Sequence, residues 1–107
     1  MKNYYKNKYL LCKVKVKRNG MDHFTLLKFG ASWCSYTTRV GCHINEVRKR
    51  YPHVDFIFYN LRYDYPVFQK YKVETLPTVI LLKNKIEIKR HDGDCSYLLE
   101  EILSLTR

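Results

Sequence analysis

The stretch FTLLKFGASWCSYT, residues 24–37, joins an apolar segment to a cysteine and guides the interpretation of the whole chain. Residues 24–29 have the length and composition of a buried strand, and residues 33–51 have the spacing of apolar side chains typical of a helix. Cys34 therefore stands where a strand is followed by a helix. Unpaired backbone N–H groups and the positive end of the helix dipole favour a thiolate at that position and lower the pKa of the thiol. The stretch predicts a reactive cysteine.

The elements that follow alternate between helix and strand. Pro52 ends the first helix, and residues 54–61 form a second strand rich in aromatic and β-branched side chains. We expect that strand to be buried on both faces and to lie in the middle of a sheet. The buried side of the helix at residues 33–51 is expected to consist of Val40, Ile44, Val47 and Tyr51.

A second helix is predicted to begin at Asp64-Tyr65-Pro66, because proline is favoured in the first turn of a helix. Residues 78–83 and 86–90 are predicted to form a hairpin around Asn84-Lys85. Gly93 follows, and Ser96 is predicted to cap a final helix. The apolar sides of the two helices are expected to be Val67, Phe68, Tyr71 and Val73, and then Leu98, Leu99, Ile102, Leu103 and Leu105.

This order of elements predicts an α/β fold. Strands that alternate with helices pair in parallel through right-handed crossovers, and the hairpin adds an antiparallel edge. The N-terminal region admits two interpretations. Residues 12–17 alternate like a strand, whereas the Lys and Arg side chains before Gly20 are typical of a helix C-terminus. We favour a strand at residues 4–9 and a helix at residues 11–19.

Length and cysteine content restrict the classes of protein. A chain of 107 residues accommodates one domain, residues 1–107. It has no apolar run long enough to span a bilayer and no signal peptide, so we expect a cytoplasmic protein. The four cysteines, Cys12, Cys34, Cys42 and Cys95, should then be reduced, and their spacing argues against a zinc site.

The positive charge is concentrated in the N-terminal half. Residues 1–50 carry twelve Lys and Arg against Asp22 and Glu46, whereas residues 51–107 carry eight basic against eight acidic residues. A basic half is able to attract nucleic acid, an anionic membrane surface or an acidic protein partner, or to serve only as a hydrated surface. The sequence lacks the motifs of nucleic-acid-binding domains, which argues against a nucleic-acid partner.

The motif Trp33-Cys34-Ser35-Tyr36-Thr37 resembles the W-C-x-x-C active site of thioredoxins, and Thr75-Leu76-Pro77-Thr78 resembles the family's proline motif. The resemblance covers about four-fifths of the chain. It implies the thioredoxin fold, a central mixed sheet of four or five strands with helices on both faces. It also implies that Pro77 follows a cis peptide bond beside the cysteine, and that Leu76 offers its backbone to an extended substrate. Trp33 and Tyr36 would surround the thiol as an aromatic surface for substrate.

Two residues depart from the family pattern. Thr37 replaces the second cysteine, which in thioredoxins resolves the mixed disulfide formed by the first. Its hydroxyl is able to donate a hydrogen bond to the Cys34 thiolate. Lys28 stands where many thioredoxins bury an acid that moves protons, and its ammonium would favour the thiolate unless burial keeps the lysine neutral.

No other cysteine of the chain is an evident replacement for the missing resolving cysteine. Cys42 lies eight residues along the same helix, about 12 Å by the helical rise, which is beyond disulfide reach, and we expect it to be a small core residue. Cys12 and Cys95 are expected to be structural or on the surface. His43, next to Cys42, should point in another direction and have no catalytic role.

Two functions are compatible with these residues. In the first, Cys34 is a single catalytic nucleophile of a thiol-disulfide oxidoreductase. It forms a mixed disulfide with a protein or with glutathione as co-substrate, and an external thiol or reductase resolves it. No other cofactor and no metal is expected. In the second, the chain is a redox-inactive binding module that holds a partner in the groove at Pro77.

Overall fold

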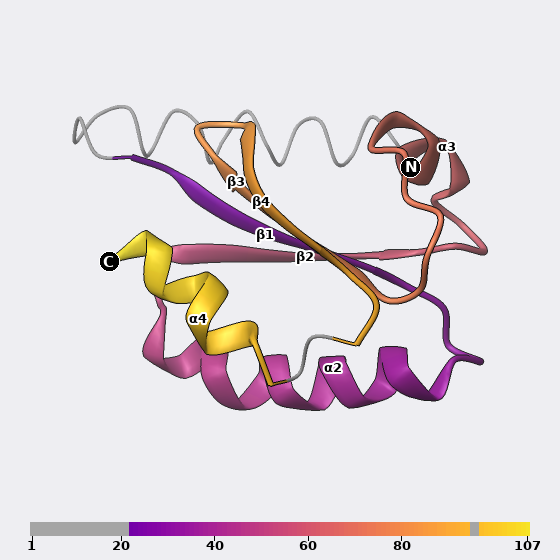
Figure 1. Ribbon diagram of the computed structural model, residues 1–107, viewed down its shortest axis with the longest axis horizontal. Helices are drawn as coiled ribbons and strands as arrows, with labels where there is room; N and C mark the ends of the chain where they lie inside the picture. Colours follow the sequence, from indigo (N-terminus) through magenta and orange to yellow (C-terminus); the bar gives the residue numbers. More distant parts are fainter. Residues whose placement is uncertain (1–21, 95–96) are drawn as a thin grey trace.

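The computed structural model describes residues 22–94 and 97–107. The strands are β1 (Phe24–Gly30), β2 (Val54–Asn60), β3 (Thr78–Lys83) and β4 (Ile86–Asp92), and they form one sheet (Figure 1). The helices are α2 (Ser35–Val47), α3 (Tyr65–Lys70) and α4 (Leu99–Leu103). Short 3₁₀ turns, η1 (Arg48–Arg50) and η2 (Ser104–Thr106), extend α2 and α4. The predicted α/β class is confirmed.

The strands lie in the order β2-β1-β3-β4. β1 pairs in parallel with β2, so that Gly30 is opposite Asn60, and pairs antiparallel with β3, so that Phe29 is opposite Thr78. The ends of β1 and β2 and the beginning of β3 therefore meet at one edge of the sheet. This edge carries the cysteine motif and the proline motif.

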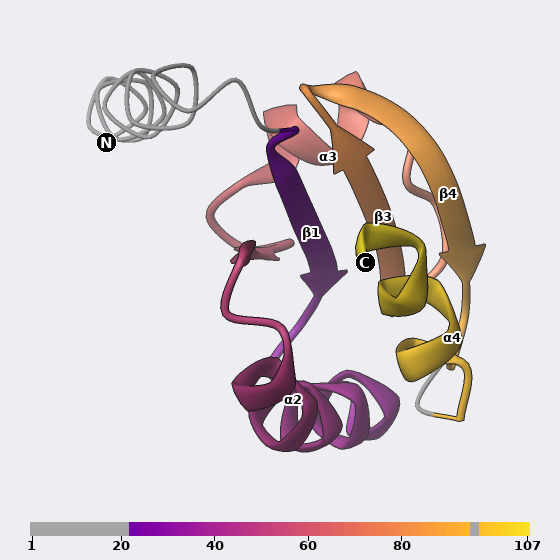
Figure 2. The ribbon, with the colours of Figure 1, turned by 90° about the vertical axis from the view of Figure 1, so that its left-hand side faces the viewer.

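Helices cover both faces of the sheet. α2 and α4 lie on one face and α3 lies on the other (Figure 2). Successive strand residues point to opposite faces, so Leu26 packs in the cluster with α2 and α4, whereas Leu27 and Phe29 pack in the cluster with α3. The predicted buried side of α2 is confirmed, because the following side chains are all buried: Val40, Ile44, Val47 and, just beyond η1, Tyr51.

The predicted hairpin and the helix at Asp64 are also confirmed. Asn84 and Lys85 both have positive φ, 52° and 73°, as a tight turn between β3 and β4 requires. Asp64 is the residue before α3, and its carboxylate accepts a hydrogen bond from the backbone N–H of Asn60 at 2.9 Å. That bond fixes the loop from β2 to α3.

One expectation about burial is wrong and concerns Leu105, whereas the expected middle position of β2 depends on residues outside the described ones. Within the described residues, β2 has only β1 beside it. Its apolar composition is explained by contacts of Val54 and Tyr59 with the cores on the two faces. Leu105 is 52% exposed because the chain turns into η2 after α4, where Thr106 takes the buried position.

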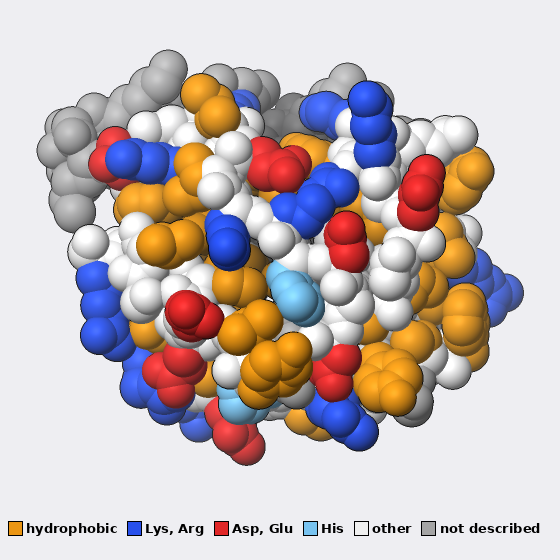
Figure 3. Space-filling model, in the orientation of Figure 1, with side chains coloured by type: hydrophobic (Ala, Val, Ile, Leu, Met, Phe, Trp, Pro, Cys, Tyr) orange, Lys and Arg blue, Asp and Glu red, His pale blue; other side chains and the backbone are white. Residues whose placement is uncertain are grey.

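Other predictions lie outside the described residues. These are the strand at residues 4–9, the helix at residues 11–19 and the cap at Ser96. The surface seen in Figure 3 mixes Lys and Arg with Asp and Glu side chains. This mixture agrees with the equal number of basic and acidic residues in the C-terminal half of the sequence. No helix in the described part of the chain is long and apolar enough to cross a membrane.

Candidate active site

The turn from β1 into α2 places Cys34 at the start of the helix. Cys34 is the N-cap residue of α2, with extended backbone angles of φ −96° and ψ 119°. Its backbone N–H donates to the carbonyl of Ala31 at 3.1 Å, and its own carbonyl accepts from the N–H of Thr38 at 3.2 Å. The side chain is partly exposed. The helix is therefore shorter at its start than the predicted residues 33–51, and the thiol stands at its N-terminal end.

The pKa of the Cys34 thiol is lowered below its ordinary value. The largest cause is a hydrogen bond with the side chain of Thr37, and the backbone N–H groups of Thr37 and Tyr36 contribute in the same direction. These groups stabilise the thiolate, as expected for a cysteine at a helix N-terminus. Lys28 is not among the groups that lower the pKa of Cys34.

Thr37 is held firmly in place behind the thiol. Its side chain is buried, and its hydroxyl oxygen accepts a hydrogen bond from the backbone N–H of Ala31 at 3.3 Å. A methyl group added at Gly30 would lie 2.3 Å from the methyl carbon of Thr37, so the close contact requires glycine there. With its oxygen accepting from Ala31, the hydroxyl has its hydrogen available for the Cys34 thiolate.

The proline loop lies at the same edge of the sheet. The peptide bond between Leu76 and Pro77 is cis, and Pro77 is buried. The carbonyl of Pro77 accepts a hydrogen bond from the N–H of Gly93 at 2.6 Å. Thr78 pairs with Phe29, two residues before the turn that leads to Cys34. Within the described residues Leu76 makes no backbone–backbone hydrogen bond, so its peptide groups are available to a bound chain.

Two exposed aromatic residues stand close to Cys34 in the sequence. Trp33 is 75% exposed and Tyr36 is 50% exposed. The guanidinium of Arg39 lies 5.3 Å from the centre of the Tyr36 ring and is paired with Asp94 at 3.2 Å. Trp33 and Tyr36 therefore present apolar surface to solvent next to Cys34, as an extended substrate would require.

Sequence interpretation missed two tyrosines at this edge. Tyr63 is 61% exposed and Tyr65 is 56% exposed, and both lie in or directly after the loop that follows β2. The N–H of Leu61 in that loop donates to the carbonyl of Gly30 at 2.9 Å. The predicted parallel pairing of the two strands already implied that this loop would end beside the cysteine, so a signal for these tyrosines was present in the sequence.

Lys28, Cys42 and His43 lie elsewhere. The Lys28 ammonium is 4.3 Å from the centre of the Phe58 ring. The thiol whose charge raises the pKa of Lys28 is that of Cys42, and Cys34 is not among the causes of the shift. Cys42 is exposed, so the expectation of a core residue is wrong: the inward side of α2 is occupied by Val40 and Ile44. His43 is not among the groups that shift the pKa of Cys34.

The site presents one activated thiol. Cys34 and Cys42 are both free, and the helical rise between them is about 12 Å, which exceeds the distance that a disulfide spans. Cys12 and Cys95 lie outside the described residues. Within residues 22–94 and 97–107, no group of three or more His, Cys, Asp or Glu side chains is suited to holding a metal ion. The arrangement can attack a disulfide at Cys34.

Replacing Thr37 by valine should raise the pKa of Cys34 toward the ordinary value. Valine keeps the shape of the buried side chain but removes the hydroxyl that stabilises the thiolate. We expect alkylation of Cys34 by iodoacetamide at neutral pH to slow several-fold, with the midpoint of the pH–rate profile moved upward. Thr38→Val, a change at the exposed neighbour, is the matched control. An unchanged profile in Thr37→Val would contradict the role of the hydroxyl.

Comparisons with known proteins point in one direction. A protein-family model described as Thioredoxin matches residues 12–104. A thioredoxin H-type from Fagopyrum esculentum is 32% identical over 68 residues, which is 64% of this chain and 59% of that protein. Thioredoxin-1 from Saccharomyces cerevisiae is 32% identical over 74 residues, 67% of this chain and 70% of that protein. The alignment thus spans less than two thirds of the Fagopyrum protein.

Solved structures give the same result for the fold. Thioredoxin NaTrxh from Nicotiana alata superimposes with a TM-score of 0.79 and 27% identity, covering 94% of this chain and 86% of that chain. A thioredoxin from Fasciola hepatica superimposes with a TM-score of 0.76 at 21% identity, covering 90% of this chain and 91% of that chain. This chain is therefore similar to these proteins over most of its length.

Proposed function

Because the chain belongs to the thioredoxin family, we propose that it catalyses thiol-disulfide exchange through Cys34 alone. The observation that supports the proposal most strongly is the pairing of Cys34 with Thr37. The hydroxyl at this position stabilises the thiolate but has no sulfur with which to complete an intramolecular cycle. The proposed enzyme therefore depends on a second thiol from outside its active-site motif.

The proposed reaction has two exchange steps. The Cys34 thiolate attacks one sulfur of a substrate disulfide, a new bond forms between Cys34 and that sulfur, and the other sulfur leaves as a thiolate and takes up a proton. An external thiol, from glutathione or from a protein reductase, then attacks the substrate sulfur of the mixed disulfide. Cys34 is released as a thiolate and the substrate carries a disulfide with the external thiol. Electrons and protons balance without another cofactor.

The surroundings of the thiol favour a protein substrate. Trp33 and Tyr36 are exposed beside Cys34, and Leu76, at the same edge of the sheet, makes no backbone–backbone hydrogen bond with another described residue. An extended segment with a disulfide is able to pair with the Leu76 backbone while its side chains contact the aromatic rings. We propose protein disulfides as substrates and glutathione as co-substrate.

A glutathione-disulfide challenge tests the proposal. The variant Cys12→Ser/Cys42→Ser/Cys95→Ser keeps only Cys34, and we expect mass spectrometry to find one glutathione on it. The adduct should persist until reduced glutathione is added. The matched variant Cys34→Ser, which keeps the other three cysteines, should lose exchange with a disulfide-bonded peptide.

Two results would overturn the proposal. If Cys34 stayed unmodified at neutral pH and Cys34→Ser exchanged as fast as the unmodified chain, the protein would be a binding module. If the unmodified chain formed an intramolecular disulfide between Cys34 and another cysteine, the external thiol would be unnecessary.

A further inference from the structure

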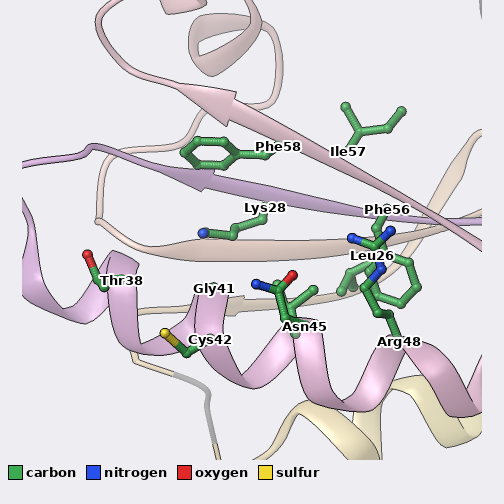
Figure 4. A pocket seen from close by; sticks show the side chains of 11 residues that line it. Leu26, Lys28, Thr38, Gly41, Cys42, Asn45, Arg48, Phe56, Ile57 and Phe58 are labelled. Carbon is green, nitrogen blue, oxygen red and sulfur yellow. The ribbon is translucent and has the colours of Figure 1, made fainter.

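A pocket lies between helix α2 and the strands β1 and β2 (Figure 4), and Cys34 is not among the residues that line it. Its volume is about 410 Å³, which lies in the range of small-molecule sites. Cys42, one of the lining residues, is eight positions beyond Cys34 on α2, about 12 Å along the helix. The proposed exchange reaction does not use this pocket.

The polar part of the pocket is positively charged. Lys28 extends from β1, and Arg48 stands at the end of α2, with the amide of Asn45 between them. Among the described residues that line the pocket, none is Asp or Glu. Within the described part of the chain, neither Lys28 nor Arg48 has a carboxylate within the 4 Å of an ion pair. Two cations with no anionic partner thus line one cavity.

The Lys28 ammonium lies against helix α2 where Gly41 leaves space for it. A methyl group added at Gly41 would lie 2.6 Å from Lys28 Nζ, so the glycine leaves the space that the ammonium occupies. Burial of the side chain lowers the pKa of Lys28, against an opposing effect of Cys42. The lysine is thereby displaced from water without gaining a carboxylate, and a bound anion would restore the lost stabilisation.

The remainder of the pocket is apolar. Accessible carbon surface comes from β2, where Phe56 is half-buried and Phe58 is exposed, whereas the lining residues Leu26 and Ile44 are almost fully buried. A fully hydrated inorganic ion would not contact this apolar surface. A molecule with one anionic group and a small apolar body would contact both the cationic and the apolar part of the pocket.

We propose that this pocket binds a small organic carboxylate. In the proposed complex the carboxylate lies near the Lys28 ammonium and the Arg48 guanidinium, with Asn45 as an additional hydrogen-bond donor. The apolar body of the ligand covers Phe56 and Phe58.

A pair of matched probes tests the proposal in the full-length chain. Phenylacetate carries the carboxylate and phenylacetamide is its neutral counterpart of the same shape. In a titration followed by two-dimensional ¹H–¹⁵N NMR, phenylacetate should give saturable shifts of the Gly41, Cys42 and Asn45 amide signals. We expect phenylacetamide to bind at least fivefold more weakly. Equal shifts with both probes, or none with phenylacetate, would overturn the proposal. If inorganic phosphate shifted the same amide signals and bound with the same affinity as phenylacetate, the ligand would not require an apolar body.

Variants separate the charge from the fold. Lys28→Gln and Arg48→Gln should each weaken phenylacetate binding by fivefold or more, because each removes one of the two cations that line the pocket. Lys49→Gln is the matched control, because Lys49 is an exposed neighbour that does not line the pocket. The NMR spectrum of each variant shows whether the fold is kept. Unchanged binding in a folded Lys28→Gln variant would overturn the proposal.

Cys42 provides a second measurement that needs no assigned spectrum. Its exposed thiol lines the same pocket, so alkylation by anionic iodoacetate, relative to neutral iodoacetamide, reports the local charge. We expect this ratio at Cys42 to fall several-fold in Lys28→Gln and to stay constant in Lys49→Gln. An equal ratio in the unmodified chain and in Lys28→Gln would contradict an anion-attracting pocket.

Discussion

Replacing Thr37 by cysteine is expected to shorten the lifetime of the Cys34 mixed disulfide by at least about 100-fold, because resolution becomes intramolecular. Thr37 lies three residues after Cys34 in the first turn of α2, and its side chain is the largest influence on the pKa of the Cys34 thiol, so we expect a thiol in its place to be close enough to attack. The products would be a disulfide between Cys34 and the introduced thiol, and a released substrate thiol. The reaction with glutathione disulfide is stopped at successive times and analysed by mass spectrometry. It should show the glutathione adduct in the unmodified chain and the intramolecular disulfide in the variant.

The neighbouring position supplies the control. Thr38→Cys adds a thiol one residue further along α2, on an exposed part of the helix that points in a different direction. This variant should keep a long-lived mixed disulfide at Cys34. Equal lifetimes in Thr37→Cys and the unmodified chain would show that position 37 cannot supply a resolving thiol in this fold.

Replacing Phe29 by alanine is expected to lower the free energy of unfolding by about 3–5 kcal/mol. The Phe29 side chain is fully buried, and its ring centre lies 5.0 Å from that of Phe68 and 5.3 Å from that of Tyr59. Alanine would leave a cavity between β1 and α3 that these rings cannot fill. A domain of this size has a total stability of only about 5–15 kcal/mol, so the variant should unfold at a much lower urea concentration.

A surface substitution in the same sheet is the control. Ile86 is 69% exposed at the start of β4, and Ile86→Ala should change the free energy of unfolding by less than about 0.5 kcal/mol. A loss below about 1 kcal/mol in Phe29→Ala would mean that the core on the α3 side adjusts to the missing ring.

Much of the fold was predictable because strong local signals agree with one another. The apolar run before Cys34, the proline before β3 and the turn at Asn84-Lys85 each restrict the backbone on their own. Their spacing leaves few ways to connect the strands. Composition alone does not place β2 in the sheet, since a strand with packed faces has the same residue types at an edge or in the middle.

The site was predictable where a side chain acts on its near neighbours. The start of α2 brings Thr37 and its backbone N–H to Cys34 because these residues belong to one helical turn. The direction in which the Lys28 side chain points depends instead on tertiary packing. A strand residue next to the active site can point under the helix if a glycine such as Gly41 leaves room, and neither the motif nor the spacing contains that information.

The exposure of Cys42 has the same origin. A cysteine is commonly buried, and its position in the helix did not distinguish the inward side from the rim of a cavity. The predicted inward positions of Val40 and Ile44 are confirmed, and Cys42, two positions from each of them, lies outside the core.

The direction of β1 has a practical consequence for handling the protein. The seven residues of β1 span about 23 Å and lead to the Cys34 end of the sheet, whereas Arg107 lies at the opposite end (Figure 1). A chain anchored to a bead or sensor surface through its C-terminus would present the thiol away from the support. Such an immobilised protein would suit the capture of mixed-disulfide partners from solution.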